Sequence, residues 1–235
     1  EPFIREDILT IIAYAKSFSL PVSLTTNGTL LDKNIIEMIV DLEIDEINFS
    51  IDGLEELHDK LRGQGNFRKV MSNMQYLLEC KKRKSLRRPT ITVNLTISPG
   101  IIGHLKHTID TIREITDDEI DFFRIHHLWF VTPRELQDHM EEVHKALDSS
   151  ACGAAAHCIP LSQHHDSVAL SSEISQLNGM GKIIFFPSLQ DQEIPDFYSE
   201  GYRMTKRCLA PFYAALVKPN GDLKFCPDEW IDGYV

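Results

Sequence analysis

The sequence has few features of a membrane, secreted or nucleic-acid-binding protein. No apolar run approaches the roughly 20 residues that a membrane span requires, and the chain does not open on a charged-then-apolar signal peptide. The five cysteines are odd in number and widely spaced, unlike a secreted disulfide framework. Only 24 Lys and Arg face 35 Asp and Glu, a net charge of −11, which argues against non-specific binding to nucleic acid or to an anionic membrane surface. We therefore expect a cytoplasmic protein.

The sequence also lacks the composition of a disordered chain, and it has little low-complexity sequence. Hydrophobic residues make up 43% and charged residues 25% of the 235 positions, which excludes an intrinsically disordered chain and fits one domain with part of a second. The basic run 81–84 is best explained as the solvated end of a helix. Because the sequence opens at Glu1 rather than Met and closes at Val235 without a polar taper, we expect both ends to be cuts through a longer protein.

Apolar spacing predicts alternating strands and helices over the first two thirds of the chain. Helices are predicted over 4–15, after a cap at Asp32, and over 66–84, 101–115 and 133–147, and strands over 22–27, 46–52, 90–98 and 121–131. A Gly-punctuated loop is expected after 52, a short helix over 171–177 and a further strand over 182–187. This alternation predicts βαβ crossovers and a parallel sheet.

The predicted strands have one apolar and one polar face. In the strand over 90–98, Ile, Val and Leu at odd positions alternate with Thr, Asn and Ser at even positions. Strands covered on both faces usually form continuous apolar runs instead. Since crossover helices cover the apolar face, we predict a closed or partly closed barrel with a polar, ligand-sized lumen. An open sheet with one solvated face is the alternative.

The C-terminal third predicts a separate small module. Segments 212–217 and 223–226 flank Asn220-Gly221, a strong hairpin signal. The segment 191–205 is expected to be a mobile loop on the substrate side. We therefore predict a barrel core over 1–190, a connecting segment over 191–207 and the start of a second module over 208–235.

Polar residues gather where the predicted strands end. Asn27, Ser50, Asp52 and Asn94 lie at or near carboxyl ends of strands on the predicted lumen side, where parallel barrels build their sites. Their hydroxyl, amide and carboxylate groups suit a polar ligand with ribose hydroxyls and an amino-acid head group. For Asn27 an ordinary turn, and for Asp52 a capped loop, are the alternatives.

Several motifs together resemble the radical S-adenosylmethionine (SAM) enzymes. Glu1-Pro2 is similar to the end of their Gly-Gly-Glu-Pro motif. Residues 24–28, followed by Leu30-Leu31, resemble their third strand. Residues 48–53, with His58, Asp59 and Arg62, resemble their fourth-strand region. Cys208, then twelve residues to Gly221 and four to Cys226, resembles the opening of the SPASM cluster-binding extension.

The resemblance implies an α/β fold: a partial (β/α)6 TIM-like barrel, its first strand missing, followed by the opening β-hairpin of a SPASM module. It implies that a [4Fe–4S] cluster reduces SAM to a 5′-deoxyadenosyl radical, which abstracts hydrogen from a peptide or protein side chain. The implied partners are that substrate and an electron donor such as flavodoxin or ferredoxin; neither nucleic acid nor a membrane is expected.

By the same resemblance, Glu1 would bind the methionine amino group of SAM, and Ser50, Asp52 and Asn94 would hold its ribose and carboxylate. Asn27 joins these cofactor-binding candidates by its position. Cys208 and Cys226 would ligate an auxiliary iron–sulfur cluster, since thiolates hold such clusters.

The sequence departs from the family in its cysteines. The family's Cys-x3-Cys-x2-Cys triad follows the first strand, and the five cysteines here show no such spacing. We expect the ligands of the radical-generating cluster, and the later SPASM cysteines, to lie outside these residues. The fragment alone is predicted to be catalytically silent.

Other polar residues have competing explanations. Arg124 and His126 on the lumen face are weak catalytic candidates that could steer substrate or transfer protons, and a structural hydrogen-bonding role is equally open. His127 is expected in the core, and Cys80 as a packed or partly exposed thiol. A zinc site is the alternative for Cys152, His157, Cys158, His164 and His165, although their spacing matches no zinc template.

The sequence leaves three alternatives to peptide modification. A radical SAM enzyme could instead act on a small metabolite or cofactor precursor. A barrel without radical chemistry could serve as a metal-binding or scaffolding protein. An aldolase-like barrel would need a catalytic Lys or metal-binding carboxylates on the lumen face, and the predicted strands supply neither.

Overall fold

The computed structural model describes residues 1–128, 130–147, 155, 157–159, 166–202, 216–217 and 223–224. The chain forms two compact units. The first comprises Glu1–Leu128 and Val168–Asp191, and the second comprises Trp129–Ser167 and Gln192–Val235. Each is described by itself.

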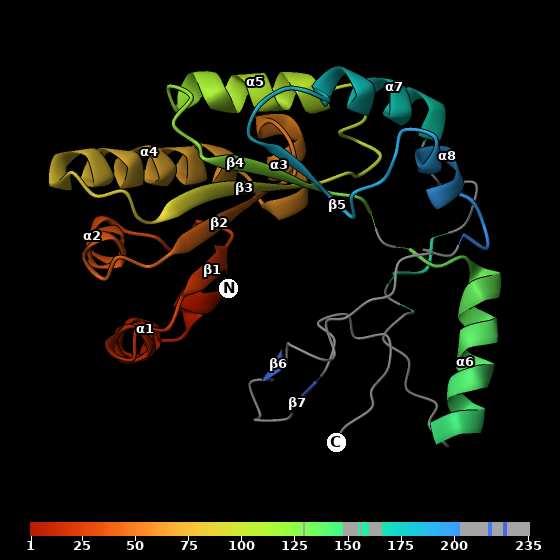
Figure 1. Ribbon diagram of the computed structural model, residues 1–235, viewed down its shortest axis with the longest axis horizontal. Coiled ribbons are helices and arrows are strands. Elements are labelled where there is room, and N and C mark those ends of the chain that lie inside the picture. Colours follow the sequence, from red (N-terminus) through yellow and green to blue (C-terminus); the bar gives the residue numbers. More distant parts are fainter. Residues whose placement is uncertain are drawn as a thin grey trace. The chain divides into compact units, whose positions relative to one another are not determined.

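A five-stranded parallel sheet organises the first unit (Figure 1). Its strands follow the order of the chain: β1 (Ser23–Thr26), β2 (Glu46–Ile51), β3 (Thr90–Thr96), β4 (Phe122–His126) and β5 (Ile183–Phe186). Every neighbouring pair is parallel, which confirms the α/β class and the predicted parallel sheet.

Helices cover the apolar face of this sheet. They are α1 (Ile8–Ser17), α2 (Lys33–Asp41), α3 (Glu55–Arg62), α4 (Asn66–Lys84), α5 (Leu105–Ile115) and α7 (Ser167–Leu177), and the short helix η1 (Pro2–Ile4) precedes them. The predicted cap of α2 is confirmed, because Asp32 Oδ1 accepts from the Ile35 amide at 2.8 Å. The apolar side chains of strands and helices meet in one core, which includes the fully buried Ile39, Ile47, Phe49, Leu77, Val93, Ile109 and Phe123.

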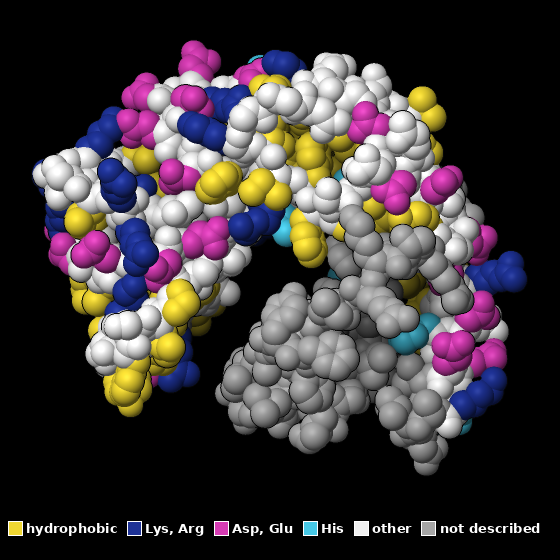
Figure 2. All heavy atoms as spheres, viewed as in Figure 1, with side chains coloured by type: hydrophobic (Ala, Val, Ile, Leu, Met, Phe, Trp, Pro, Cys, Tyr) yellow, Lys and Arg dark blue, Asp and Glu magenta, His cyan; other side chains and the backbone are white. Residues whose placement is uncertain are grey.

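The basic run at the end of α4 is matched by acidic partners. Lys81 pairs with Asp121 at 3.8 Å and Arg83 with Glu37 at 3.0 Å, while Lys82 pairs with Glu119. Figure 2 shows basic and acidic side chains interspersed over this part of the surface. Lys82 and Arg83 are exposed, as expected for a solvated helix end, whereas the Lys81 side chain is 11% exposed.

The second unit contains α6 (Pro133–Leu147) and α8 (Glu193–Phe197). Thr132 and Glu135 form a reciprocal capping box at the start of α6: Thr132 Oγ1 accepts from the Glu135 amide at 3.2 Å, and Glu135 Oε2 accepts from the Thr132 amide at 2.8 Å. Strands β6 (Leu216–Val217) and β7 (Leu223–Lys224) pair antiparallel, inside the two segments expected to form a hairpin. The assignment of this hairpin to a SPASM module stays a prediction.

Several predicted boundaries are wrong. The segment after Asp52, expected as a loop, contains α3, and the loop expected over 191–205 contains α8. The first helix begins at Ile8 rather than at 4, α5 at Leu105 rather than at 101, and β4 ends at His126 rather than at 131. Among the described residues, no helix combines the length and apolarity needed to cross a bilayer.

Candidate functional site

The polar face of the sheet is arranged in rows, because parallel strands place register partners side by side. Nearer the amino ends lie two rows: Ser23, Glu46 and Thr90, then Thr25, Asn48, Thr92 and Phe122. Nearer the carboxyl ends lie two more: Ser50, Asn94, Arg124 and Ile184, then Thr96, His126 and Phe186. The two halves of this face differ in how their polar atoms are satisfied.

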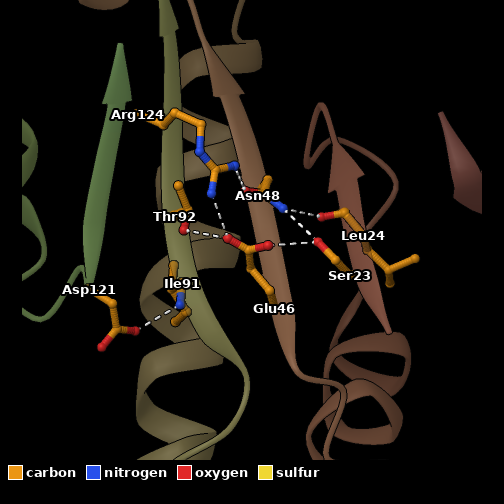
Figure 3. A network of polar contacts seen from close by, with 8 residues as sticks. All are labelled: Ser23, Leu24, Glu46, Asn48, Ile91, Thr92, Asp121 and Arg124. Atoms are coloured by element: carbon orange, nitrogen blue, oxygen red, sulfur yellow. Dashed lines mark hydrogen bonds and ion pairs between the residues drawn. The ribbon is translucent and has the colours of Figure 1, made fainter. Parts of the chain in front are cut away.

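The amino-end half is closed by hydrogen bonds among five side chains, Ser23, Glu46, Asn48, Thr92 and Arg124, here called the Glu46 network (Figure 3). Glu46 Oε1 accepts from Arg124 Nη2 at 3.0 Å and from Thr92 Oγ1 at 3.1 Å. Glu46 Oε2 accepts from Ser23 Oγ at 2.8 Å. The carboxylate therefore joins residues from all four strands β1 to β4.

Asn48 completes the Glu46 network. Its Oδ1 accepts from Arg124 Nη1 at 2.8 Å, and its Nδ2 donates to Ser23 Oγ at 3.0 Å and to the Leu24 carbonyl at 3.1 Å. Burial acts to raise the pKa of Glu46, but hydrogen bonds from Ser23 and Arg124 outweigh it, so the pKa lies below its usual value. Glu46 is therefore ionised at neutral pH.

Arg124 was a weak catalytic candidate, and its side chain lies in this network. The guanidinium reaches from the third row back to Glu46 and Asn48 (Figure 3). Its side chain is 31% exposed and that of Glu46 is 25% exposed. This geometry favours the hydrogen-bonding alternative over a catalytic role.

The carboxyl-end half of the polar face contains polar atoms without partners. Asn94 Oδ1, Ser98 Oγ and His126 Nε2 are buried and have no hydrogen-bond partner among the described residues. Asn94 lies in the third row and His126 in the fourth, and Ser98 follows the end of β3 by two residues. A buried polar atom left unpaired costs about 1–3 kcal/mol, so three together indicate a place for a polar ligand.

Glu1 lies at the carboxyl end of β1. Thr26 Oγ1 donates to Glu1 Oε1 at 2.8 Å, and the Asn27 amide donates to Glu1 Oε2 at 2.8 Å. Oε1 also accepts from the Phe3 amide at 3.4 Å, and Oε2 lies 3.0 Å from Thr26 Oγ1, so these bonds fix the position of the carboxylate.

Asn27 is used locally. Its Oδ1 accepts from the Thr29 amide at 2.9 Å and from Thr29 Oγ1 at 2.7 Å, which closes a turn. Gly28 follows with a φ of +73°, and a Cβ there would lie 3.0 Å from the Phe49 ring. The turn alternative fits this geometry, and a cofactor contact through the Asn27 side chain has no support from it.

Ser50 and Asp52 lie at the end of β2. Ser50 is half-buried beside Asn94. The Asp52 carboxylate pairs with Arg62 of α3: Arg62 Nε bonds Oδ2, and Nη2 donates to Oδ1 at 3.2 Å. Both oxygens retain a lone pair, so Asp52 can still accept from a ligand hydroxyl. The side chain of Arg62 was outside the predicted site, although its motif was part of the resemblance.

His126 combines an unpaired nitrogen with an aromatic neighbour. Its ring lies against Phe186, with the centroids 5.6 Å apart. Burial, and then the charge of Arg124, hold the pKa of His126 below its usual value, so the imidazole is neutral at pH 7. His127 is 1% exposed, which confirms that it belongs to the core.

The metal candidates are only partly described. Cys208, Cys226, Cys152, His164 and His165 lie outside the described residues. Within the described part of the chain, no group of three or more His, Cys, Asp or Glu residues is arranged to hold a metal ion. Cys80 is fully buried, as expected for a packed thiol.

The model of the Radical SAM superfamily matches residues 1–124. The AdoMet-dependent heme synthase of Methanosarcina barkeri is 31% identical over 145 residues, covering 55% of this chain and 41% of the relative. The probable GTP 3′,8-cyclase of Methanococcus maripaludis is 35% identical over 117 residues, covering 49% and 37%.

A solved structure has the same fold over most of the chain. Streptococcus suis SuiB bound to S-adenosylmethionine superposes with a TM-score of 0.61 at 13% identity, covering 97% of this chain and 47% of that one. The chain thus spans less than half the length of each of these relatives. Since the family model covers more than half of its residues, the chain belongs to the radical SAM superfamily.

Proposed function

We propose that the whole protein is a radical SAM oxidoreductase or maturase that abstracts hydrogen from a peptide or protein side chain. One observation carries the cofactor site: the amino-end half of the polar face is satisfied by its own residues, while the carboxyl-end half keeps buried Asn94, Ser98 and His126 atoms unpaired. Cofactors do the hard chemistry, and protein groups bind and orient them.

Bound SAM, reduced by a [4Fe–4S] cluster, supplies the 5′-deoxyadenosyl radical that takes the hydrogen atom. Four residues of this chain have matching chemistry for the cofactor. The Glu1 carboxylate, held by Thr26 and the Asn27 amide, accepts from the methionine ammonium. Ser50 donates to the methionine carboxylate, and Asp52 and Asn94 accept from ribose hydroxyls.

The remaining partners follow from the same proposal. The ligands of the radical-generating cluster belong to a Cys-x3-Cys-x2-Cys triad outside these 235 residues. Cys208 and Cys226 ligate an auxiliary iron–sulfur cluster, and a flavodoxin or ferredoxin donates electrons. The spacing of Cys208, Gly221 and Cys226 is what supports a peptide substrate, because the SPASM extension it resembles is common among peptide-modifying members.

A second candidate substrate class is a small metabolite or cofactor precursor. Its support is the set of relatives, which are named for heme synthesis and GTP cyclisation. A non-catalytic barrel or metal-binding scaffold is the third candidate, and it predicts that the protein neither binds oxygen-labile iron nor cleaves SAM.

Anaerobic reconstitution of the whole protein with iron and sulfide tests the proposal. With SAM and a chemical reductant, we expect formation of 5′-deoxyadenosine, measured by chromatography against a sample without iron. If the reconstituted protein forms no 5′-deoxyadenosine, the result supports the scaffold alternative. Mixing with candidate peptides in one series, and with porphyrins and GTP in another, identifies the substrate class by which series raises 5′-deoxyadenosine above the substrate-free level.

A further inference from the structure

Helix α3 holds Asp52 at two points. The Asp52 amide donates to His58 Nδ1 at 3.3 Å, and the Asp52 carboxylate pairs with Arg62. His58 and Arg62 are four residues apart, so both lie on one side of the helix. The backbone and the side chain of Asp52 are thus fixed by the same element.

His58 is suited to accept this bond as a neutral imidazole. The residue is 0% exposed, and its ring lies against Phe67 with the centroids 5.8 Å apart. Burial lowers the pKa of His58, and this effect outweighs the nearby Asp52 carboxylate, which acts to raise it. Because an amide can only donate, Nδ1 is the acceptor and the proton is on Nε2.

The second nitrogen of His58 shows that packing alone does not explain the residue. His58 Nε2 is buried and has no hydrogen-bond partner in the described part of the chain. An unpaired buried N–H costs free energy that an apolar side chain of the same size would avoid. The histidine offsets this cost with the hydrogen bond that its other nitrogen, Nδ1, accepts from the Asp52 amide.

Close contacts fix α3 against the end of β2, so the bond has a defined geometry. A Cβ on Gly53 would lie 2.7 Å from Leu57 Cδ2, and one on Gly100 would lie 2.8 Å from Leu57 Cδ1. On the other side, Asp59 accepts from the amides of Gly65 at 2.6 Å and Phe67 at 2.8 Å, which ties α3 to the start of α4.

We infer that His58 is a positioning residue of the cofactor site: its Nδ1 holds the Asp52 amide and thereby sets where the Asp52 carboxylate meets the ribose of SAM. The inference rests on the proposed role of Asp52. It assigns to α3 the function of presenting a cofactor-binding carboxylate.

Two substitutions separate positioning from packing. In His58→Asn, the amide oxygen replaces Nδ1 and still accepts a hydrogen bond; in His58→Leu, the apolar volume is kept and the acceptor is lost. Using the whole reconstituted protein, we expect His58→Leu to weaken SAM binding about tenfold and His58→Asn by less than about threefold, since one hydrogen bond is worth roughly one decade of affinity. Asp52→Ala, which we expect to leave the iron content unchanged, gives the loss of SAM affinity that follows when the carboxylate itself is removed.

Hydrogen exchange at the Asp52 amide provides a readout independent of SAM. We expect faster exchange in His58→Leu than in the wild type, and near wild-type exchange in His58→Asn. The inference is overturned if His58→Leu keeps both the SAM affinity and the slow amide while His58→Asn loses them, as a packing role requires. If the wild type binds no SAM but its Asp52 amide still exchanges more slowly than that of His58→Leu, the proposed function fails while the contact between His58 and Asp52 stands.

Discussion

At the scale of single residues, the polar face separates side chains that serve the fold from side chains available to a ligand. Arg124 and His126 both looked like lumen residues in the sequence. In the structure the Arg124 guanidinium is consumed by Glu46 and Asn48, whereas His126 Nε2 is buried without a partner among the described residues. Alternation identifies the face that a side chain occupies, but not the partner that it reaches.

The Glu46 network gives a prediction about stability. Removing Glu46 leaves the half-buried Arg124 guanidinium without its carboxylate, so Glu46→Leu is expected to cost about 1–3 kcal/mol. Arg124→Met removes the other partner. In a double-mutant cycle followed by urea unfolding, we expect a coupling of about 1 kcal/mol or more. A coupling near zero would show that the ion pair does not stabilise the sheet.

The buried histidines predict a pH dependence. Burial, the largest cause for each, lowers the pKa of His58 and of His126 from the usual 6.5. As the pH falls below about 6.5, the unfolded chain binds protons that these folded imidazoles refuse, so the free energy of unfolding decreases. Carboxylates with lowered pKa values, such as Asp45 and Glu46, lose their contribution only at more acidic pH.

Thermal unfolding at about pH 7.5 and pH 5.5 measures this effect. We expect the wild type to lose more stability between the two pH values than a variant carrying His58→Asn and His126→Asn. Equal losses in both proteins would show that other groups titrate in this window.

At the scale of elements, the sequence predicted the sheet better than the helix next to the site. The strands alternate clearly, and β2 and β3 begin at the predicted residues. Helix α3 was missed because it lies between glycines and has a largely polar sequence. Its position depends on tertiary contacts such as Asp52 with His58, and Asp59 with the amides of Gly65 and Phe67, which local periodicity does not encode.

The close packing of α3 against Gly53 predicts the effect of a glycine substitution. Gly53 has a φ of +144°, and an added Cβ would lie 2.7 Å from Leu57. Gly53→Ala is therefore expected to destabilise the protein by about 2–4 kcal/mol, from backbone strain and overlap together. Gly179→Ala is the control: its φ is +88°, but no atom lies within 4 Å of the added Cβ.

The difference between these two variants measures the overlap with Leu57 together with the greater backbone strain at the φ of +144°, and urea unfolding gives its value. We also expect Gly53→Ala, but not Gly179→Ala, to weaken SAM binding, because a displaced α3 no longer holds Asp52. Equal destabilisation by both substitutions would mean that α3 relaxes away from Gly53 without cost.

At the scale of the whole molecule, motif order gave the family, and geometry gave the arrangement within it. The sequence placed Glu1, Ser50, Asp52 and Asn94 near strand ends, and the structure describes all four in one unit. What the sequence could not supply was the division of the polar face into a satisfied and an unsatisfied half. That division arises from side chains reaching across strands, as Arg124 does to Glu46.

The division predicts opposite responses to removing a hydroxyl at the two ends of the face. Thr92 Oγ1 is bonded to Glu46 at 3.1 Å, so Thr92→Val is expected to cost about 1 kcal/mol of stability and to leave SAM binding unchanged. Ser98 Oγ has no partner among the described residues. Ser98→Ala removes an unpaired buried hydroxyl, so the ligand-free protein is expected to keep or gain stability.

We also expect Ser98→Ala to weaken SAM binding, because the lost hydroxyl can no longer bond to the ligand. Sites of this kind trade stability of the ligand-free protein for function. Urea unfolding of ligand-free protein and SAM titration of the reconstituted protein, each on Thr92→Val and Ser98→Ala, give the four values needed. Loss of stability in Ser98→Ala with unchanged affinity would place Ser98 with the fold rather than with the site. The opposite pattern would add Ser98, which follows the end of β3, to the cofactor site.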